Sequence, residues 1–116
     1  GGAQRPAQHA YGRMFSLPLA ARTGMLFIFG KDAPRSFWMK NTPISLDMLF
    51  FASDGRLVGI IANTEPFSLT ARKSQKAAQY VLEIGGGEAA RLGLGSLTRL
   101  HLPVAAAVNS AGSQEK

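Results

Sequence analysis

Short apolar runs alternate with polar turns along most of the chain, and this spacing predicts strands rather than long helices. The run at residues 24–29 is apolar on both faces, which is typical of a buried strand. Runs of this kind predict six strands, at residues 24–29, 35–40, 45–52, 57–63, 78–84 and 96–102.

Turn-forming residues separate these runs. Asp54 and Gly55 give the strongest hairpin signal, because Asp-Gly accepts the positive φ values that a tight turn between two strands requires. Pro43 favours an extended residue before it, so it predicts a break between the second and third strands. Pro66 cannot donate to a strand ladder and ends the fourth strand, and the polar residues 66–77 are predicted to form a loop.

The pattern also predicts two short helices. Pro6 suits the first turn of a helix, and Tyr11, Met14 and Phe15 lie three and four residues apart on one helical face. These residues predict a first helix near the start of the chain, and residues 88–92 are expected to form the second.

Three glycines at positions 85–87 precede the second predicted helix. They match neither a phosphate-binding loop nor a dinucleotide-binding turn, so they predict a tight turn between a strand and a helix. Glu88 lies at the positive end of the helix dipole, and Gly93 suits the left-handed position after the helix.

Together these elements predict an α+β fold in which β-structure dominates. We expect a single curled sheet or a small barrel of about six strands with two short helices. Residues 6–103 are predicted to form a single globular domain. The termini, residues 1–5 and 104–116, are too poor in large apolar side chains to order themselves and are predicted to be disordered.

The composition excludes several kinds of chemistry. The 116 residues include no cysteine, which rules out disulfides, thiolate nucleophiles and cysteine-held metals. His9 and His101 lie far apart without a carboxylate at ligand spacing, so no metal site and no cofactor is predicted. No apolar run approaches the ~18 residues of a membrane span. Although the net charge is +6, the basic residues are scattered except for Arg72, Lys73 and Lys76, so no nucleic-acid partner is predicted.

Residues 36–51 are the segment in which charges interrupt apolar strands. Asp47 shares a strand face with bulky apolar residues, and a buried carboxylate needs a cation or several hydrogen-bond donors. If the strands on either side of the 41–44 turn pair with each other, Lys40 comes close to Asp47. A period of two places Trp38 and Lys40 on one face and their neighbours on the other.

These side chains predict a pocket with an aromatic floor, an ammonium, an amide, a hydroxyl and a carboxylate. The predicted ligand-binding residues are Trp38, Lys40, Asn41, Thr42 and Asp47. A set of this kind suits a small polar or anionic ligand, for example a carboxylate-bearing or glycan fragment. The sequence carries no signal for an oligomeric state.

Two other interpretations stay open. Glu83 interrupts the strand at residues 78–84, and if it reached Asp47 the two carboxylates would supply the acid and base of a small hydrolase or lyase. Glu83 is otherwise a solvent-side residue of an alternating strand. In the second interpretation the cluster is purely structural, and Asp47 accepts hydrogen bonds from the amides of the 41–44 turn. An enzyme is less favoured than a binding module, because no complete catalytic set is present.

Four blocks of the chain resemble one family in order and spacing. The blocks are residues 24–29 (GMLFIF), 37–42 (FWMKNT), 46–50 (LDMLF) and 80–84 (YVLEI), followed by Gly87. Across residues 10–102 the chain resembles the uncharacterised prokaryotic family called domain of unknown function 192. Ser16 departs from the pattern, because it stands where members of that family often carry an arginine.

The resemblance implies a single compact, mainly β domain with no established activity, cofactor or partner. Members of the family often follow an export or lipoprotein signal, so a periplasmic or cell-envelope location is expected for this protein. The chain does not open with the charged and apolar regions of a signal peptide, and we therefore expect that a leader has been removed.

Overall fold

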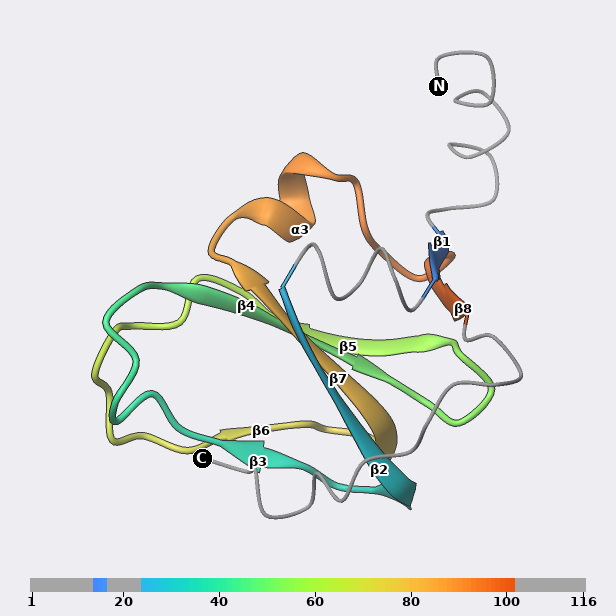
Figure 1. The fold of residues 1–116 in the computed structure, drawn as a ribbon, viewed down its shortest axis with the longest axis horizontal. Helices are drawn as coiled ribbons and strands as arrows, with labels where there is room; N and C mark the ends of the chain where they lie inside the picture. The colour runs from blue at the N-terminus through green and yellow to red at the C-terminus, as the bar shows by residue number, and fades with distance from the viewer. Residues whose placement is uncertain (1–13, 17–23, 102–116) are drawn as a thin grey trace.

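The computed structural model describes residues 14–16 and 24–101 (Figure 1). Strands dominate this part of the chain, as the sequence predicts. They are β1 (Met14–Ser16), β2 (Met25–Ala33), β3 (Ser36–Phe37), β4 (Leu46–Phe51), β5 (Leu57–Ile61), β6 (Arg72–Lys73), β7 (Ala78–Gly85) and β8 (Arg99–His101), and the described helix is α3 (Glu88–Arg91).

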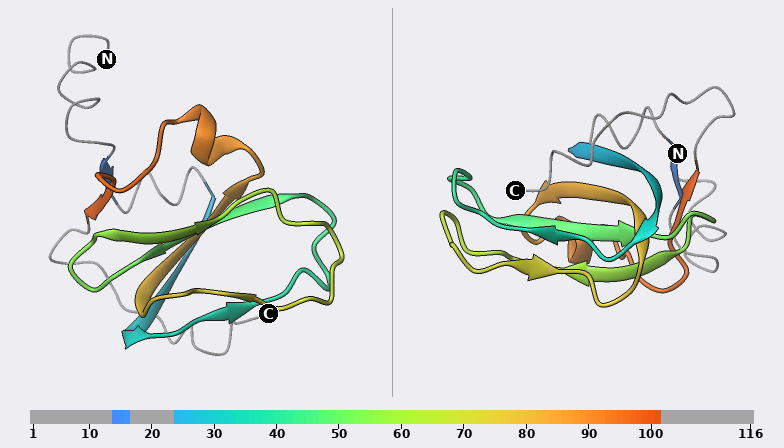
Figure 2. Two further views of the ribbon diagram at one scale, coloured as in Figure 1. Left: turned by 180° about the vertical axis from the view of Figure 1, so that it is seen from behind. Right: turned by 90° about the horizontal axis from the view of Figure 1, so that it is seen from below.

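The main sheet is antiparallel and has the strand order β2-β7-β4-β5. A two-stranded antiparallel sheet of β3 and β6 lies on one side of it, and α3 lies on the other (Figure 1). A third pair, β1 and β8, is parallel and separate from the main sheet. The views in Figure 2 show that the main sheet twists but stays open.

The alternation of side chains along β4 and β7 divides the core between the two faces of the sheet. The core on the β3–β6 side consists of Phe27, Phe29, Phe37, Met39, Leu46, Met48, Phe50, Ala78 and Val81. The core on the α3 side consists of Leu49, Phe51, Leu82, Ile84, Ala89 and Leu100. All six residues of β4 are buried, because both of its faces are covered and it lies between two other strands.

The Asp-Gly hairpin between β4 and β5 is confirmed. Gly55 has a φ of 89°, and the N–H of Ala52 donates to the carbonyl of Arg56 at 2.9 Å. Asp54 Oδ1 accepts from the N–H of Arg56 at 3.0 Å, and this hydrogen bond between two turn residues stabilises the turn. The predicted glycine turn and short second helix are also confirmed, since Gly87 precedes α3 and Gly93 follows it with a φ of 70°.

Other details of the predicted fold are wrong. The sheet does not close into a barrel, and α3 is the one helix among residues 14–16 and 24–101. Met14 and Phe15 belong to β1, so they do not end a helix, while the rest of that predicted helix lies outside the described residues. The predicted disordered segments 1–5 and 104–116 also lie outside them.

Two strand predictions fail for one physical reason. The strand expected at residues 35–40 is reduced to β3, and it pairs with β6, which forms inside the loop expected at residues 66–77. The strand expected at 96–102 is reduced to β8 and pairs with β1. Pairing partners come from distant parts of the chain, and local patterns do not identify them.

Candidate functional site

Asp47 is fully buried on β4, where its carboxylate accepts three backbone hydrogen bonds. Oδ1 accepts from the N–H of Asn63 at 2.8 Å and from the N–H of Gly87 at 3.0 Å. Oδ2 accepts from the N–H of Ala89 at 2.8 Å. These bonds replace the water that the carboxylate loses on burial.

The Asp47 carboxylate caps α3. Gly87 is the N-cap residue, and no side chain of its own caps the helix, so the amides of Gly87 and Ala89 would otherwise lack an acceptor. Asp47 also holds the end of the β5 strand through Asn63, whose φ is 52°. One side chain therefore joins β4, the residues after β5 and the turn between β7 and α3.

The prediction that Asp47 needs several donors is confirmed, but the predicted donors are wrong. The amides come from Asn63, Gly87 and Ala89 rather than from the 41–44 turn. The strands on either side of that turn do not pair with each other, since β3 pairs with β6 and β4 lies between β5 and β7. The expected approach of Lys40 to Asp47 through that pairing is therefore also wrong.

Trp38 and Lys40 lie together at the surface. The Lys40 Nζ is 5.2 Å from the centroid of the Trp38 ring, which is within the range of a cation–π contact. Phe37 and Met39 are fully buried, so the predicted alternation of faces is confirmed. Lys40 is exposed, and the contact with Trp38 directs its ammonium to a ring and not to a buried carboxylate.

Glu83 is buried on β7, with 4% of its surface exposed. The expectation that it lies on the solvent side is therefore wrong. In the ladder between β4 and β7, Asp47 lies opposite Ile84 and Met48 lies opposite Glu83. Directly opposed residues share a face and successive residues alternate, so Glu83 and Asp47 point to opposite faces of the sheet. The two carboxylates do not form an acid–base pair.

A groove of about 470 Å³ lies beside Glu83. Two of the predicted ligand-binding residues, Asn41 and Thr42, line it together with Glu83. Met25 and Ile44 add apolar side chains to its walls, and they are 58% and 60% exposed. The structure thus divides the predicted pocket: Asn41 and Thr42 lie at the groove, while Asp47 is enclosed beneath α3.

Backbone hydrogen bonds position the groove wall that Asn41 and Thr42 form. The Thr42 N–H donates to the carbonyl of Met39 at 3.0 Å, and the Thr42 carbonyl accepts from the N–H of Phe67 at 3.0 Å. Buried Thr64 accepts the Leu46 N–H at 3.1 Å through its hydroxyl, which also donates to the Leu46 carbonyl at 3.0 Å. The turn before β4 is therefore fastened to the segment after β5.

Sequence reasoning missed three residues here. Met25 was expected to be core, because all the methionines lie in apolar segments, yet it is largely exposed at the groove. Ile44 beside Pro43 carried no signal apart from its being an isolated apolar residue in a turn. Thr64 follows a strand, and a hydroxyl at such a position often bonds nearby backbone groups.

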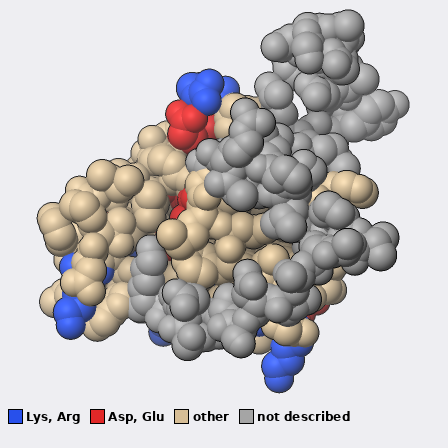
Figure 3. All heavy atoms as spheres, in the orientation of Figure 1, with Lys and Arg blue, Asp and Glu red and all other residues tan. Residues whose placement is uncertain are grey.

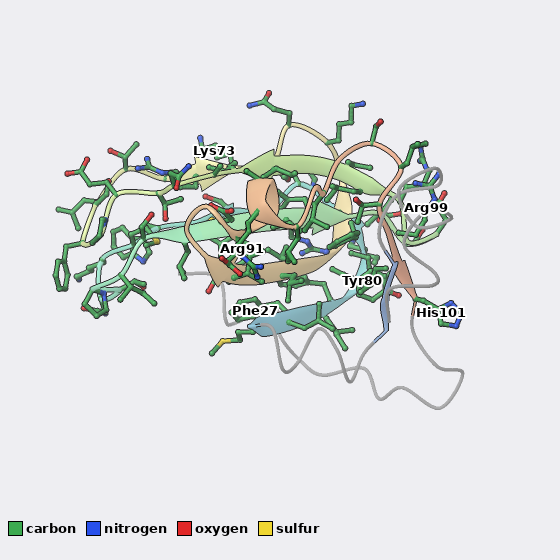
Figure 4. The ribbon with its side chains drawn as sticks, turned by 90° about the horizontal axis from the view of Figure 1, so that it is seen from above. Phe27, Lys73, Tyr80, Arg91, Arg99 and His101 are labelled. Atoms are coloured by element: carbon green, nitrogen blue, oxygen red, sulfur yellow. The ribbon has the colours of Figure 1, made fainter. Side chains whose placement is uncertain are left out.

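On the α3 side of the sheet, Glu88 and Arg91 form an ion pair at the surface. Arg91 donates two hydrogen bonds to Glu88, with distances of 2.8 Å from Nε to Oε2 and 2.6 Å from Nη2 to Oε1. These bonds lower the pKa of Glu88 below its usual value, while slight burial and the negative charge of Asp47 act in the opposite direction. Arg91 lies on α3, and Lys73 lies on β6 (Figure 4).

Neither a metal site nor a membrane-spanning helix is found in the described part of the chain. No three histidine, aspartate or glutamate side chains gather there in a way that would hold a metal ion. No helix in residues 24–101 has the length and apolar character needed to cross a bilayer.

An open β-dominated sheet, a capped one-turn helix and a groove beside a buried glutamate define a small domain of unknown function. The profile of the family called domain of unknown function 192 (DUF192), described as an uncharacterized ACR, matches residues 2–102. The chain therefore belongs to this family, and the resemblance seen in the sequence is confirmed.

Two crystal structures are similar to the chain. One is a protein from Sinorhizobium meliloti 1021 described as a "putative transcription regulator", with 37% identity, a TM-score of 0.60, and coverage of 72% of this chain and 74% of that one. The other is a protein of unknown function from Novosphingobium aromaticivorans DSM 12444, with 40% identity, a TM-score of 0.61, and coverage of 77% and 64%. No curated protein matches the chain.

Proposed function

We propose that this protein is a binding module whose groove beside Glu83 takes a small ligand with an apolar body and a cationic, hydrogen-bond-donating head. The observation that carries the proposal is a carboxylate that is 4% exposed and lines a groove with largely exposed apolar side chains. Small-ligand sites typically combine apolar walls with a few converging polar groups.

The polar groups of the groove favour a cationic, hydrogen-bond-donating ligand over an anionic ligand. Glu83 is the one acidic or basic side chain among the described residues that line it, and a carboxyl group in apolar surroundings favours a cationic or hydrogen-bond-donating partner. Asn41 and Thr42 add an amide and a hydroxyl that orient a polar head. Met25 and Ile44 offer contact to an apolar body. We therefore replace the anionic ligand of our sequence-based prediction with a cationic one.

A small acid–base enzyme is a weaker interpretation of the same site. It required Asp47 and Glu83 to face each other, and the ladder register separates them. The described residues that line the groove with Glu83 are otherwise uncharged, so they supply no second acid or base for such chemistry. Recognition without chemistry needs only the groove, and that is the function we propose.

A role in transcription, which the description of the Sinorhizobium protein suggests, has less support. Arg35 is buried, and Arg91 makes two hydrogen bonds to Glu88. On the face shown in Figure 3, the Lys and Arg side chains lie apart at the margins rather than in one patch. Phosphate binding requires cations gathered along one surface.

The location in the cell envelope remains a proposal that rests on the family resemblance. A ligand of the proposed kind, with an apolar body and an amine head, suits a compartment that contains amphipathic amines. Fractionation of cells that carry the native gene, with detection of the protein by antibody, tests the location: enrichment in the cytosolic fraction would contradict it.

The function is tested with two matched probes, hexylamine and hexanoate, which share an apolar chain and differ in head charge. NMR titration of the labelled protein is expected to show binding of hexylamine, with shifts centred on residues 41–44 and 83–85. Glu83→Gln keeps the size of the side chain and removes its charge, so we expect it to weaken amine binding by about tenfold.

Lys40→Ala is the matched control, because Lys40 lies on the Trp38 ring and does not line the groove. It is expected to leave the affinity for hexylamine unchanged. The proposal fails if hexanoate binds the groove more tightly than hexylamine, or if Glu83→Gln binds both probes as the native protein does. The NMR spectrum of each free variant establishes that it is folded.

A further inference from the structure

The outer edge of β5 is a second candidate binding surface. β5 is the last strand of the main sheet, and its five residues (LVGII) carry no charge. On its outer side, the N–H of Leu57 donates to the carbonyl of Thr98 at 3.3 Å, so the start of the strand is covered. Beyond Leu57, no strand of the described chain pairs with this side of β5.

The ladder between β4 and β5 locates the usable part of this edge. Its register shifts between Phe50 and Phe51, which leaves Val58 as an extra residue on β5. Gly59, Ile60 and Ile61 then pair regularly with β4, and Ile60 is 36% exposed. A regular apolar edge of this kind is a template for another strand.

A groove of about 530 Å³ runs along the same strand. Val58, Gly59 and Ile60 line it, and two cationic side chains, Arg56 and Lys76, lie at its border. Arg56 also pairs with Asp54 at 2.8 Å, but both side chains are more than half exposed, and surface pairs of this kind are weak. The groove therefore joins an open strand edge with positive charge.

We propose that this edge binds an extended acidic segment of a partner protein by strand addition, with main-chain hydrogen bonds to Gly59–Ile61 and carboxylates beside Arg56 and Lys76. Main-chain bonds supply affinity in such complexes, and flanking charges supply specificity. The groove is lined by residues other than those beside Glu83, so this surface is independent of the proposed ligand site.

Charge argues against a second copy of this chain as the occupant. Each chain has a net charge of +6, and pairing two β5 edges would bring Arg56 and Lys76 of each copy to one interface. Like charges brought together at an interface repel each other and disfavour the complex. A partner segment with glutamate or aspartate at alternate positions complements the same groove.

The probe is an eight-residue peptide that alternates valine and glutamate, and its partner peptide has lysine in place of glutamate. Fluorescence anisotropy is expected to show binding of the acidic peptide at least tenfold tighter than that of the basic one. NMR shifts on binding are expected at Gly59–Ile61 and at Gly95 and Ser96, which line the groove. N-methylation of alternate amides in the acidic peptide removes ladder donors and is expected to abolish binding.

Lys76→Glu reverses a charge at the groove and is expected to weaken the acidic peptide about tenfold. Lys73→Glu makes the same change on β6, outside the groove, and is expected to have little effect. The proposal is overturned if the acidic peptide does not bind at about 1 mM, if the N-methylated peptide binds equally well, or if both variants weaken binding alike. Dimerisation through β5 in sedimentation experiments, abolished by Ile60→Lys, would also overturn it.

Discussion

Two buried carboxylates lie one position apart in the ladder between β4 and β7 and have opposite surroundings. Asp47 points to the α3 side and accepts three backbone N–H groups. Glu83 points to the other side, next to Met48 in the ladder, and lines an open groove. Both side chains are at least 96% buried, with exposures of 0% and 4%.

The comparison shows that burial of an acid does not by itself identify its role. The donors to Asp47 belong to the backbone of three separate segments, so the carboxylate holds the fold together and has no room for a ligand. Glu83 instead shares a groove with the exposed side chains of Met25 and Ile44. The accessibility of the space next to the carboxylate distinguishes the structural acid from the candidate binding residue.

The largest expected effect comes from Asp47→Asn. An asparagine oxygen replaces one carboxylate oxygen, but its NH₂ group meets another N–H donor, so at least one buried amide loses its acceptor. We expect the free energy of unfolding to fall by about 3 kcal/mol, and the Tm by more than about 10 °C. Circular dichroism during heating and urea unfolding measure both quantities.

Glu83→Gln is the matched change on the other face and is expected to cost less stability than Asp47→Asn, because glutamine keeps the size of the glutamate side chain and can still accept a hydrogen bond. Equal losses of stability for the two variants would contradict the division into a structural and a binding carboxylate. A larger loss of stability for Glu83→Gln than for Asp47→Asn would indicate that Glu83 is the structural carboxylate.

Gly87→Ala tests the same division through the backbone. Gly87 has a φ of 89° and donates to Asp47, so a side chain there strains the turn that presents the amides to the carboxylate. We expect a loss of about 1–2 kcal/mol in the free energy of unfolding. Gly30→Ala is the control, since a Cβ at Gly30 meets no atom within 4 Å and its φ is not in the left-handed region. Equal stability of the two variants would show that the turn at Gly87 accepts a side chain without disturbing the amides that bind Asp47.

The elements of the fold that depend on local sequence were predictable. Strand alternation put Phe37 and Met39 on one face and Trp38 and Lys40 on the other, and the Asp-Gly pair predicted the hairpin at Gly55. The helix at Glu88 followed from its position after three glycines. In each case the signal lies within a few residues, where steric and hydrogen-bonding preferences act directly.

The site was predicted only in part, because it depends on long-range register. The sequence identified Asp47 as a buried acid that needs donors, but its donors lie 16, 40 and 42 positions further along the chain. A shift of one residue between β4 and β7 would have put Glu83 on the face of Asp47. Which face each acid occupies is therefore a property of the assembled sheet.

The smallest expected effect is that of the Asp47 charge on the pKa of Glu88. Glu88 has a pKa below its usual value because of its hydrogen bonds from Arg91, and the charge of Asp47 opposes this shift. An acid whose pKa is lower in the folded chain stabilises the fold above its unfolded-state pKa, and this stability is lost as the pH falls through the folded-state pKa. NMR titration of the Glu88 carboxyl carbon measures the pKa directly.

Asp47→Asn removes the opposing charge, so we expect the pKa of Glu88 to fall further in this variant than in the native protein. Arg91→Gln removes the donor and is expected to raise the pKa of Glu88 towards its usual value. The variant therefore loses a small stabilisation at neutral pH and none in acid, where Glu88 is protonated, and the loss is small because the pair is exposed to solvent. Asp54→Asn is the control, since Asp54 pairs with Arg56 on a different turn. An unchanged pKa of Glu88 in a folded Asp47→Asn variant would contradict this prediction and show that the three amides confine the effect of the Asp47 charge.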